Sequence, residues 1–515
     1  MGGRRPLLAA LFLSLAVAAA AQLPYLVAAR LASEGTVFAG FLINPIDGFS
    51  YLAKMRQGAD GSWLFRLPYA ADPGPGAFIY VYYLALGHLA TVLSLPLTAA
   101  YGLARFAGAV GMYLAAFVFL RRALGPQGPF WPAFLITLLA SGLGWLAIPI
   151  GLVTPDLWMP EVIPILSAYA NAHFPLAVAA LLTAAVAVMG GGEERPAVRF
   201  GLGLASGMVI GIVLPFVAVS LVAILMLWLA WEHFRGEPIR SRVAPFAGVV
   251  LGSAPWLVYD FWLSRAHPAL AGWTAQNQTP SPPPYEFAIG YGLILLLAVL
   301  GAARARPQDS AGGRLLLTWA IVNALLLYAP FGLQRRLSLG LFFPLAALAA
   351  LGLQSLSTRA PARRAALAGV IILSLPSTLL VVGAGLGGVA RGSPELVMMD
   401  GETAAYVWAG DNLPPGALVL AGPMTGNRLP AFGDVRVLYG HPFETPDAQA
   451  NLDLVERLYG GTMPITEAQA LLDALDVSYV FYGPDERALG SPGWLEGLER
   501  AYQAGDVVIY RVRGP

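Results

Sequence analysis

The stretch Asn44-Pro45-Ile46-Asp47-Gly48-Phe49-Ser50-Tyr51 follows the first long apolar run of the chain, and Lys54 and Arg56 come within two turns of its aspartate. An ionised aspartate beside a membrane-spanning run is tolerated where it meets water or a ligand, because burying an unpaired charge is costly. The sequence Asn-Pro-x-Asp-Gly is also common turn chemistry. The stretch is therefore either a reaction centre or a solvated turn, and features elsewhere in the sequence are needed to distinguish the two.

The composition is that of a membrane protein with several spans. Of 515 residues, 57% are hydrophobic and 12% are charged, against about 25% charged residues in a soluble domain. The net charge of +1 gives no indication of a nucleic-acid partner. The chain contains no cysteine, which excludes disulfides, thiol catalysis and cysteine metal sites.

Apolar windows of about 17–25 residues predict about eleven transmembrane helices. They lie near residues 6–29, 99–120, 129–150, 173–190, 199–215, 216–233, 243–263, 285–303, 314–330, 337–356 and 366–389. The basic loop clusters share one side of the membrane only if a further window, 77–95, does not cross it. These clusters are Arg4-Arg5, Arg121-Arg122, Arg235/Arg240/Arg242, Arg304/Arg306/Arg314 and Arg359/Arg363/Arg364. We therefore expect 77–95 to lie along the outer interface as an amphipathic or re-entrant helix. The N-terminus is then cytoplasmic and the C-terminus outside.

The composition changes near residue 396. We expect residues 1–395 to form a transmembrane domain with a long outer loop at 30–98, and residues 396–515 to form an extracytoplasmic α/β domain. In the second domain, predicted helices at 401–412, 447–460 and 466–475 alternate with predicted strands at 417–421, 435–439, 477–482 and 507–512. Glycines 203, 207 and 211 recur every four residues, which predicts close packing of two helices.

Two ionisable residues near the predicted outer face are candidates for chemistry. Glu161 lies in an apolar segment flanked by prolines, and His173 begins a predicted span. Ionisable groups in such places are functional candidates by default. The alternative is an interfacial pair, for example Asn171 with His173, that caps the helix.

Arg335 and Arg336 face outward in this topology, against the bias that the other basic clusters obey. Two guanidinium groups suit a phosphate or pyrophosphate, which they can bind bidentately. The alternatives are anionic lipid headgroups or the C-terminal domain. Lys54 and Arg56 are further candidates for the phosphate, and they could also position Asp47 or be solvated.

Several uncharged side chains are candidates for binding a substrate, and the amides of the run 276–278 are of the kind that can bind sugar hydroxyl groups. The candidates are Tyr51, Asn171, Gln276, Asn277 and Gln334. For the run 276–278, a hydrophilic loop tip would look the same. No spacing requires a cofactor, and a divalent metal stays an option that no ligand pattern indicates.

The order of segments in the first third is distinctive. One span is followed by Asp47-Gly-Phe-Ser-Tyr51-Leu-Ala-Lys54…Gly58…Gly61-Ser-Trp63, by a glycine-rich to aromatic segment at 73–95, and by a span that runs from near Arg105 to Arg121-Arg122. This order resembles GT-C-type membrane glycosyltransferases, which include protein mannosyltransferases and the aminoarabinose transferases of lipid A. The resemblance covers residues 1–125 by motif order and the remainder by architecture. The segment Thr425-Gly-Asn…Tyr439-Gly-His441 resembles the tails of uncharacterised bacterial members.

The resemblance implies a polyprenyl-phosphate-linked sugar donor, transfer on the outer face, and Asp47 as the base or acceptor-orienting carboxylate. Many members carry an acidic pair where this chain has Asp47-Gly48. This difference leaves three alternatives open. Asp47 acts alone, Glu161 serves as the second carboxylate, or the protein has lost activity.

We therefore expect an inverting glycosyltransferase of the plasma membrane, in contact with membrane lipids. Its acceptor would be an extracytoplasmic glycan, lipid or protein. Glu161 or His173 would support Asp47, and Arg335 and Arg336 would hold the leaving phosphate. The alternatives are a lipid or polysaccharide transporter, or a non-catalytic membrane protein that binds envelope glycans.

Overall fold

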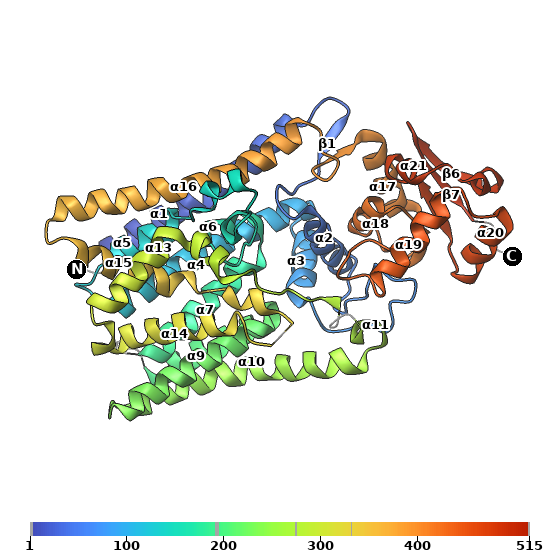
Figure 1. Ribbon diagram of the computed structural model, residues 1–515. Coiled ribbons are helices and arrows are strands. Elements are labelled where there is room, and N and C mark those ends of the chain that lie inside the picture. Colours follow the sequence, from blue (N-terminus) through green and yellow to red (C-terminus); the bar gives the residue numbers. More distant parts are fainter. Residues whose placement is uncertain (1–3, 191–194, 273–275, 331, 513–515) are drawn as a thin grey trace. The chain divides into compact units, whose positions relative to one another are not determined.

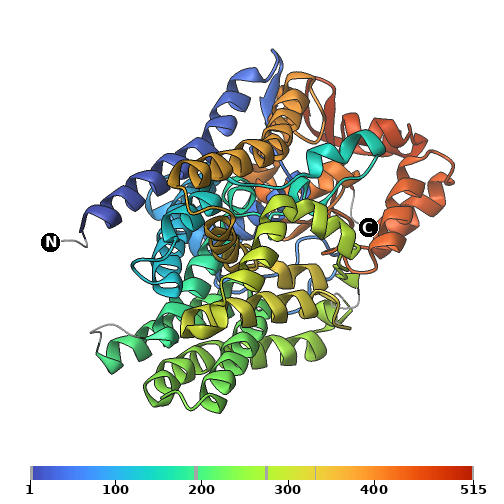
Figure 2. The ribbon, with the colours of Figure 1, turned by 60° about the vertical axis from the view of Figure 1, so that its left-hand side comes forward.

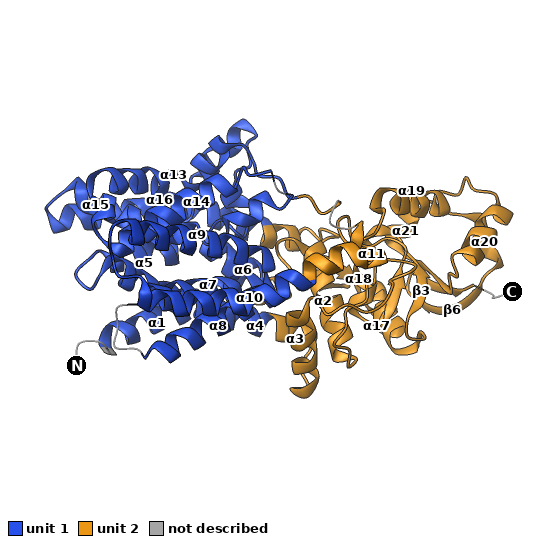
Figure 3. Ribbon diagram, turned by 90° about the horizontal axis from the view of Figure 1, so that it is seen from below, with its two compact units in different colours: residues 1–24, 102–259, 279–384 blue, residues 25–101, 260–278, 385–515 orange. Residues whose placement is uncertain are grey.

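The computed structural model describes residues 4–190, 195–272, 276–330 and 332–512. The sequence also predicts outer loops at 264–284 and 330–336, and their residues 273–275 and 331 lie outside this description. The chain divides into two compact units (Figure 3). Residues 1–24, 102–259 and 279–384 form the first unit, and residues 25–101, 260–278 and 385–515 form the second.

The first unit is built from helices that run alongside one another (Figures 1 and 2). Wholly within it are α5 (Phe130–Leu139), α6 (Pro164–Ala170), α7 (His173–Met189), α8 (Pro196–Val213), α9 (Pro215–Phe234), α13 (Pro284–Arg304), α14 (Ala311–Leu326) and α15 (Phe342–Leu356). Four helices begin in one unit and end in the other: α1 (Arg4–Leu31), α4 (Leu97–Leu124), α10 (Arg240–Ala266) and α16 (Ala360–Ala390).

Within the described residues, seven helices are long and apolar enough to cross a membrane: α1, α4, α8, α9, α10, α13 and α16. Five shorter apolar helices accompany them: α3 (Val81–Val92), α5, α7, α14 and α15. This content supports the predicted polytopic helical membrane protein, while the count of about eleven spans stays a prediction.

The predicted span at 129–150 is wrong in its extent. Helix α5 ends at Leu139, and short 3-10 turns follow through residue 150. The carboxylate of Asp156 accepts the backbone N–H of Gly144 (3.0 Å). A Cβ at Gly142 would lie 2.4 Å from Asp156 Oδ2. The chain is therefore folded around this buried carboxylate where a continuous helix was expected.

The predicted close packing at the glycine repeat is confirmed. Helix α8 lies against α10 in the first unit (Figure 3). A Cβ at Gly203 would lie 2.3 Å from the carbonyl oxygen of Pro245, and one at Gly207 would lie 2.3 Å from that of Val249. Any larger residue would push the two backbones apart.

The C-terminal part of the second unit is an α/β fold. Its five-stranded sheet has the order β4-β3-β5-β7-β6. Strand β3 is parallel to β4 and β5, and β7 is antiparallel to β5 and β6. The strands are β3 (Ala417–Leu420), β4 (Val435–Val437), β5 (Tyr479–Tyr482), β6 (Glu499–Ala504) and β7 (Val507–Arg511). The helices are α17 (Asp400–Asn412), α18 (Pro423–Arg428), α19 (Ala448–Tyr459), α20 (Ile465–Ala474) and α21 (Pro484–Leu489).

These bounds confirm the helices and strands predicted from residue 401 onward, whereas α18, α21 and β6 were not predicted. Buried side chains from β3, β5, α19 and α20 form the core of this part, among them Leu418, Val480, Leu458 and Leu472. A separate two-stranded antiparallel sheet joins β1 (Thr36–Phe38) to β2 (Val397–Met399).

The window 77–95 forms α3, a helix of 12 residues. A helix needs about 20 residues to span the hydrocarbon core of a membrane, so α3 is too short to cross one unaided. It packs on α2 (Pro45–Ala59) through two glycines. A Cβ at Gly87 would lie 1.9 Å from the carbonyl oxygen of Met55, and one at Gly58 would lie 2.1 Å from that of Leu84. Helices α2 and α3 therefore form a tight pair that supports the Asp47 region.

Candidate active site

Asp47 lies in the first turn of α2. Asn44, which precedes the helix, has a left-handed backbone (φ 48°, ψ 54°), and Pro45 is the first helical residue. Proline suits this position because the first helical N–H has no partner within the helix. A carboxylate in the first turn is favoured by the helix dipole. The Asp47 side chain keeps 44% of its surface exposed, so a ligand can reach it.

His441 holds one oxygen of this carboxylate. Its Nε2 lies 3.1 Å from Asp47 Oδ1, and its side chain is 3% exposed. The other ring nitrogen, Nδ1, accepts the backbone N–H groups of Phe443 (3.1 Å) and Glu444 (3.2 Å). A ring nitrogen that accepts hydrogen bonds carries no proton, so the proton of the neutral ring sits on Nε2. His441 is therefore a donor that orients the Asp47 carboxylate.

The turn from Gly440 to Thr445 positions His441. The Thr445 hydroxyl accepts the backbone N–H groups of Gly440 (3.3 Å) and His441 (3.1 Å). Tyr69 stacks on the imidazole with ring centroids 6.0 Å apart. A Cβ at Gly440 would lie 2.4 Å from Tyr69 Cδ1, so glycine leaves room for that ring. Both hydrogen bonds and packing thus fix the imidazole.

A buried ion pair connects α2 to the same turn. Lys54 Nζ lies 2.8 and 2.9 Å from the two carboxylate oxygens of Glu444. Lys54 is 0% exposed and Glu444 is 8% exposed. The Ser50 hydroxyl accepts a hydrogen bond from Lys54 (2.8 Å) and donates one to Glu444 (2.9 Å). The Tyr80 ring adds a cation–π contact, with Nζ 4.4 Å from its centroid. Lys54 is therefore buried and paired with Glu444 rather than solvated, and its predicted roles toward Asp47 and the phosphate stay predictions.

The charges of the pair depend on each other. Burial lowers the pKa of Lys54, and the charge of Glu444 opposes that shift. For Glu444, burial acts to raise the pKa. The charge of Lys54 and the hydrogen bonds from Lys54 and Ser50 outweigh it, so the pKa of Glu444 is held below its usual value. Removing one partner of such a pair leaves an uncompensated buried charge, which costs about 3–5 kcal/mol.

Gly48 stands where a second carboxylate was considered, and the structure explains why no side chain fits there. A Cβ at Gly48 would lie 2.4 Å from the ring of Phe41. The Phe41 ring packs edge-on against the rings of Phe49 and Tyr101, with centroid distances of 5.7 Å and 5.4 Å. The groups that accompany Asp47 come instead from the turn at 440–445.

The other predicted residues of the second unit have defined places. Tyr51 is half-buried and stacks on Tyr83, with ring centroids 4.7 Å apart and an interplanar angle of 6°. Arg56 pairs with Asp60 one turn along α2 (3.1 Å). Gln276 Nε2 donates to the carbonyl oxygens of Thr445 (2.6 Å) and Pro442 (3.3 Å), so this side chain braces the turn that carries His441. Asn277 follows it and is partly exposed.

The remaining predicted residues belong to the first unit. Arg335 and Arg336 are partly exposed and lie in a short 3-10 helix, Gln334–Ser338. The Arg335 guanidinium lies 5.0 Å from the Trp158 ring, and that of Arg336 lies 5.9 Å from the Phe216 ring. A guanidinium held over an aromatic face can still direct its N–H groups at an oxyanion. Gln334 accepts the backbone N–H of Ser281 (3.1 Å) and donates to the Ala329 carbonyl (2.7 Å), which holds this loop.

Glu161 and His173 are buried in the first unit, at 7% and 5% exposure. Glu161 borders a cavity of about 10 Å³, about the least space that admits one water molecule. His173 begins α7, whose N-cap Ala172 offers no side-chain hydrogen bond. Asn171 ends α6 as its C-cap residue and is 5% exposed. The supporting roles of these residues stay predictions.

His441 and Glu444 were not assigned to a site from the sequence. The signal that could have found them is a polar turn, Gly440-His-Pro-Phe-Glu-Thr445, that follows a buried strand of a parallel pair. Side chains beyond the carboxyl ends of such strands often form functional sites. Among the described residues, no group of three or more histidines, aspartates and glutamates is arranged to hold a metal ion.

Comparison with known proteins identifies the fold. No protein-family model and no curated protein sequence matches the chain. The chain is similar to the apo oligosaccharyltransferase of Archaeoglobus fulgidus, with 12% identity, a TM-score of 0.55, and coverage of 96% of this chain and 72% of that one.

Two further solved structures are similar. ArnT from Cupriavidus metallidurans, bound to undecaprenyl phosphate, matches with 14% identity, a TM-score of 0.52, and coverage of 97% and 98% of the two chains. The mycobacterial arabinofuranosyltransferase AftD matches with 17% identity, a TM-score of 0.59, and coverage of 100% of this chain and 40% of that one. The fold expected from the segment order is therefore confirmed, and the chain has the GT-C fold of membrane glycosyltransferases.

Proposed function

We propose that this chain is a membrane glycosyltransferase that moves a sugar from a polyprenyl-phosphate carrier to an acceptor hydroxyl on the outer side of the membrane. The observation that carries the proposal is the half-exposed Asp47 carboxylate at the start of α2, oriented by the buried His441. An oriented carboxylate that a ligand can reach is what a general base requires. The similarity of the fold to solved glycosyltransferases supports this choice of reaction.

In this reaction, the acceptor hydroxyl attacks the anomeric carbon of the sugar and passes its proton to Asp47. A new carbon–oxygen bond forms as the bond to the phosphate breaks, and the electron pair leaves with the phosphate. A phosphate is stable as an anion and needs little protonation on leaving. One carboxylate therefore suffices, whereas glycoside hydrolysis uses two. A single displacement of this kind inverts the anomeric configuration.

Arg335 and Arg336 are the proposed binders of the donor phosphate. Guanidinium groups can bind it bidentately and neutralise charge as the glycosidic bond breaks. Two comparisons support a lipid-linked donor and an outer acceptor. ArnT was solved with undecaprenyl phosphate, and the Archaeoglobus oligosaccharyltransferase, at a TM-score of 0.50, was solved with a tethered acceptor peptide.

The test supplies purified protein with radiolabelled undecaprenyl-phosphate sugars and an envelope extract as acceptor. Wild type should release undecaprenyl phosphate and label the acceptor. Asp47→Asn should lower kcat, and Arg335→Ala should raise the KM for the donor. Asp60→Asn is the matched control, since Asp60 is an exposed carboxylate at the other end of α2 and is paired with Arg56. If no donor yields transfer, or if Asp47→Asn keeps the wild-type rate, the proposal is wrong.

A further inference from the structure

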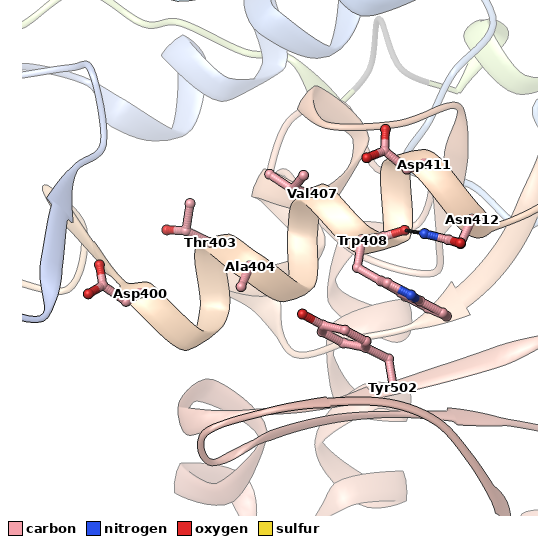
Figure 4. Close-up of a pocket in the computed structure, with 8 residues that line it drawn as sticks. All are labelled: Asp400, Thr403, Ala404, Val407, Trp408, Asp411, Asn412 and Tyr502. Atoms are coloured by element: carbon pink, nitrogen blue, oxygen red, sulfur yellow. Dashed lines mark hydrogen bonds between the residues drawn. The ribbon is translucent and has the colours of Figure 1, made fainter.

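An open groove of about 580 Å³ lies on the C-terminal part of the second unit, between α17 and β6. Eight residues line it (Figure 4): Asp400, Thr403, Ala404, Val407, Trp408, Asp411, Asn412 and Tyr502. Most of them belong to α17 and recur at spacings of three or four, which places them on one face of the helix. The opposite face of α17 is buried, through Tyr406 and Ala409 among others. The groove is thus the outward face of a well-anchored helix.

Two aromatic rings give the groove an apolar floor. Trp408 of α17 and Tyr502 of β6 stack with centroids 4.8 Å apart and an interplanar angle of 12° (Figure 4). Val407 is 48% exposed beside them. The stacked rings cover one face of each other, which holds both rigid and leaves their remaining edges and faces as apolar surface. The apolar faces of sugar rings can pack on such a surface.

Polar groups surround this floor. Figure 4 shows Asp400 at one end of the helix and Asp411 and Asn412 at the other, with the Thr403 hydroxyl between them. Carboxylates accept hydrogen bonds from hydroxyl groups. The Thr403 hydroxyl donates to the Met399 carbonyl (3.1 Å) and the Asn412 amide to the Trp408 carbonyl (2.9 Å), and the oxygens of both side chains can accept further hydrogen bonds. From Asp400 to Asp411 the helix rises by roughly 16 Å. A surface of this length suits an extended chain better than a single small molecule.

The charge of the lining narrows the class of ligand. Two of the eight lining residues are aspartates, and none is a lysine, arginine or histidine. Phosphate groups, nucleic acids and anionic glycans would be repelled. An acidic lining excludes anionic chains, and its aromatic rings, amide and hydrogen-bond acceptors favour a chain of sugar rings rich in hydroxyl groups.

We propose that this groove binds a neutral oligosaccharide segment of the acceptor. The proposal rests on the transferase function for the presence of such an acceptor. The groove itself is a binding site distinct from the Asp47–His441 pair, since none of the residues of that pair lines it. It would hold a growing or recipient glycan while its end reacts elsewhere.

The test measures binding without transfer. Full-length protein in detergent is titrated calorimetrically with neutral hexasaccharides of glucose, mannose and arabinofuranose, in the absence of donor. At least one should bind, and Trp408→Ala should weaken that binding by about tenfold or more. Ala404→Arg is a second variant at an exposed position, which fills the groove without removing a packed ring. Asp473→Asn on the exposed side of α20 is the control and should bind as wild type does.

The proposal is overturned if none of the hexasaccharides binds, if both groove variants bind as tightly as wild type, or if peptides bind the groove and hexasaccharides do not. These outcomes are separate from a failure of the transferase proposal, which is judged by the transfer rate of Asp47→Asn.

Discussion

At the scale of single residues, the central contact joins Asp47 to His441. Because Nδ1 of His441 accepts two backbone N–H groups, Nε2 is left to donate to the carboxylate. We predict that His441→Ala lowers kcat by about tenfold to a hundredfold and leaves the KM for the donor unchanged, since orientation of the base is lost while donor binding is kept. Steady-state kinetics with separate kcat and KM values measure this.

His441→Gln is the matched variant, because its side-chain amide can still donate an N–H to Asp47. It should retain more activity than His441→Ala. Equal losses in the two variants, or a raised donor KM in both, would contradict a role through orientation of the carboxylate.

The Lys54–Glu444 pair predicts a loss of stability in acid. In the folded chain the pKa of Glu444 lies below its usual 4.5, because Lys54 and its hydrogen bonds outweigh the effect of burial. The unfolded chain therefore takes up the proton first as the pH falls. This contribution to stability is complete above pH 4.5 and is lost as the pH falls from there through the folded pKa. The melting temperature in detergent should fall over that window.

The control for this prediction removes both charges together. Lys54→Met alone should cost about 3–5 kcal/mol, whereas Lys54→Met with Glu444→Leu should recover much of that loss. The double variant should also lose less stability in acid. If the melting temperature of the double variant falls in acid as much as that of the wild type, other carboxylates cause the loss of stability.

At the scale of elements, α2 and α3 depend on two glycines. A Cβ at Gly87 would lie 1.9 Å from the backbone oxygen of Met55, which no side-chain rotation can relieve. We predict that Gly87→Ala costs about 1–3 kcal/mol or more of stability and lowers transfer, because α2 carries Asp47. Thermal unfolding and the transfer assay measure the two effects. Gly102→Ala is the control, since nothing lies within 4 Å of its added Cβ.

Elements were largely predictable from the sequence because hydrophobic periodicity is local. The helices and strands that were predicted from residue 401 onward match their positions in the structure, although α18, α21 and β6 were not predicted. The window 129–150 failed because Asp156, which accepts the N–H of Gly144, stabilises turns where apolarity favoured a helix.

The active-site contacts could not be predicted in the same way. Asp47 and His441 are separated by 394 residues, and Lys54 and Glu444 by 390. A pattern over neighbouring residues carries no information about such pairs. The sequence also could not show why residue 48 must be glycine, since this depends on the position of the Phe41 ring.

At the scale of the whole molecule, the arginine clusters predict a cytoplasmic N-terminus and an outer C-terminal domain. We expect protease added to intact cells to remove a tag at the C-terminus and to spare a tag at the N-terminus. If the C-terminal tag is protected from the protease, the orientation is opposite to the predicted one. Asp47 and its acceptor would then lie on the inner side.

The central claim is that Asp47 is the base of a sugar transfer. The most direct measurement is kcat for transfer from a saturating undecaprenyl-phosphate sugar by Asp47→Asn, beside Asp60→Asn at the residue that caps the other end of the same helix. We predict a loss of about 10²–10⁴-fold in the first variant and a wild-type rate in the second. A wild-type rate in Asp47→Asn, or an equal loss in both variants, would contradict the claim.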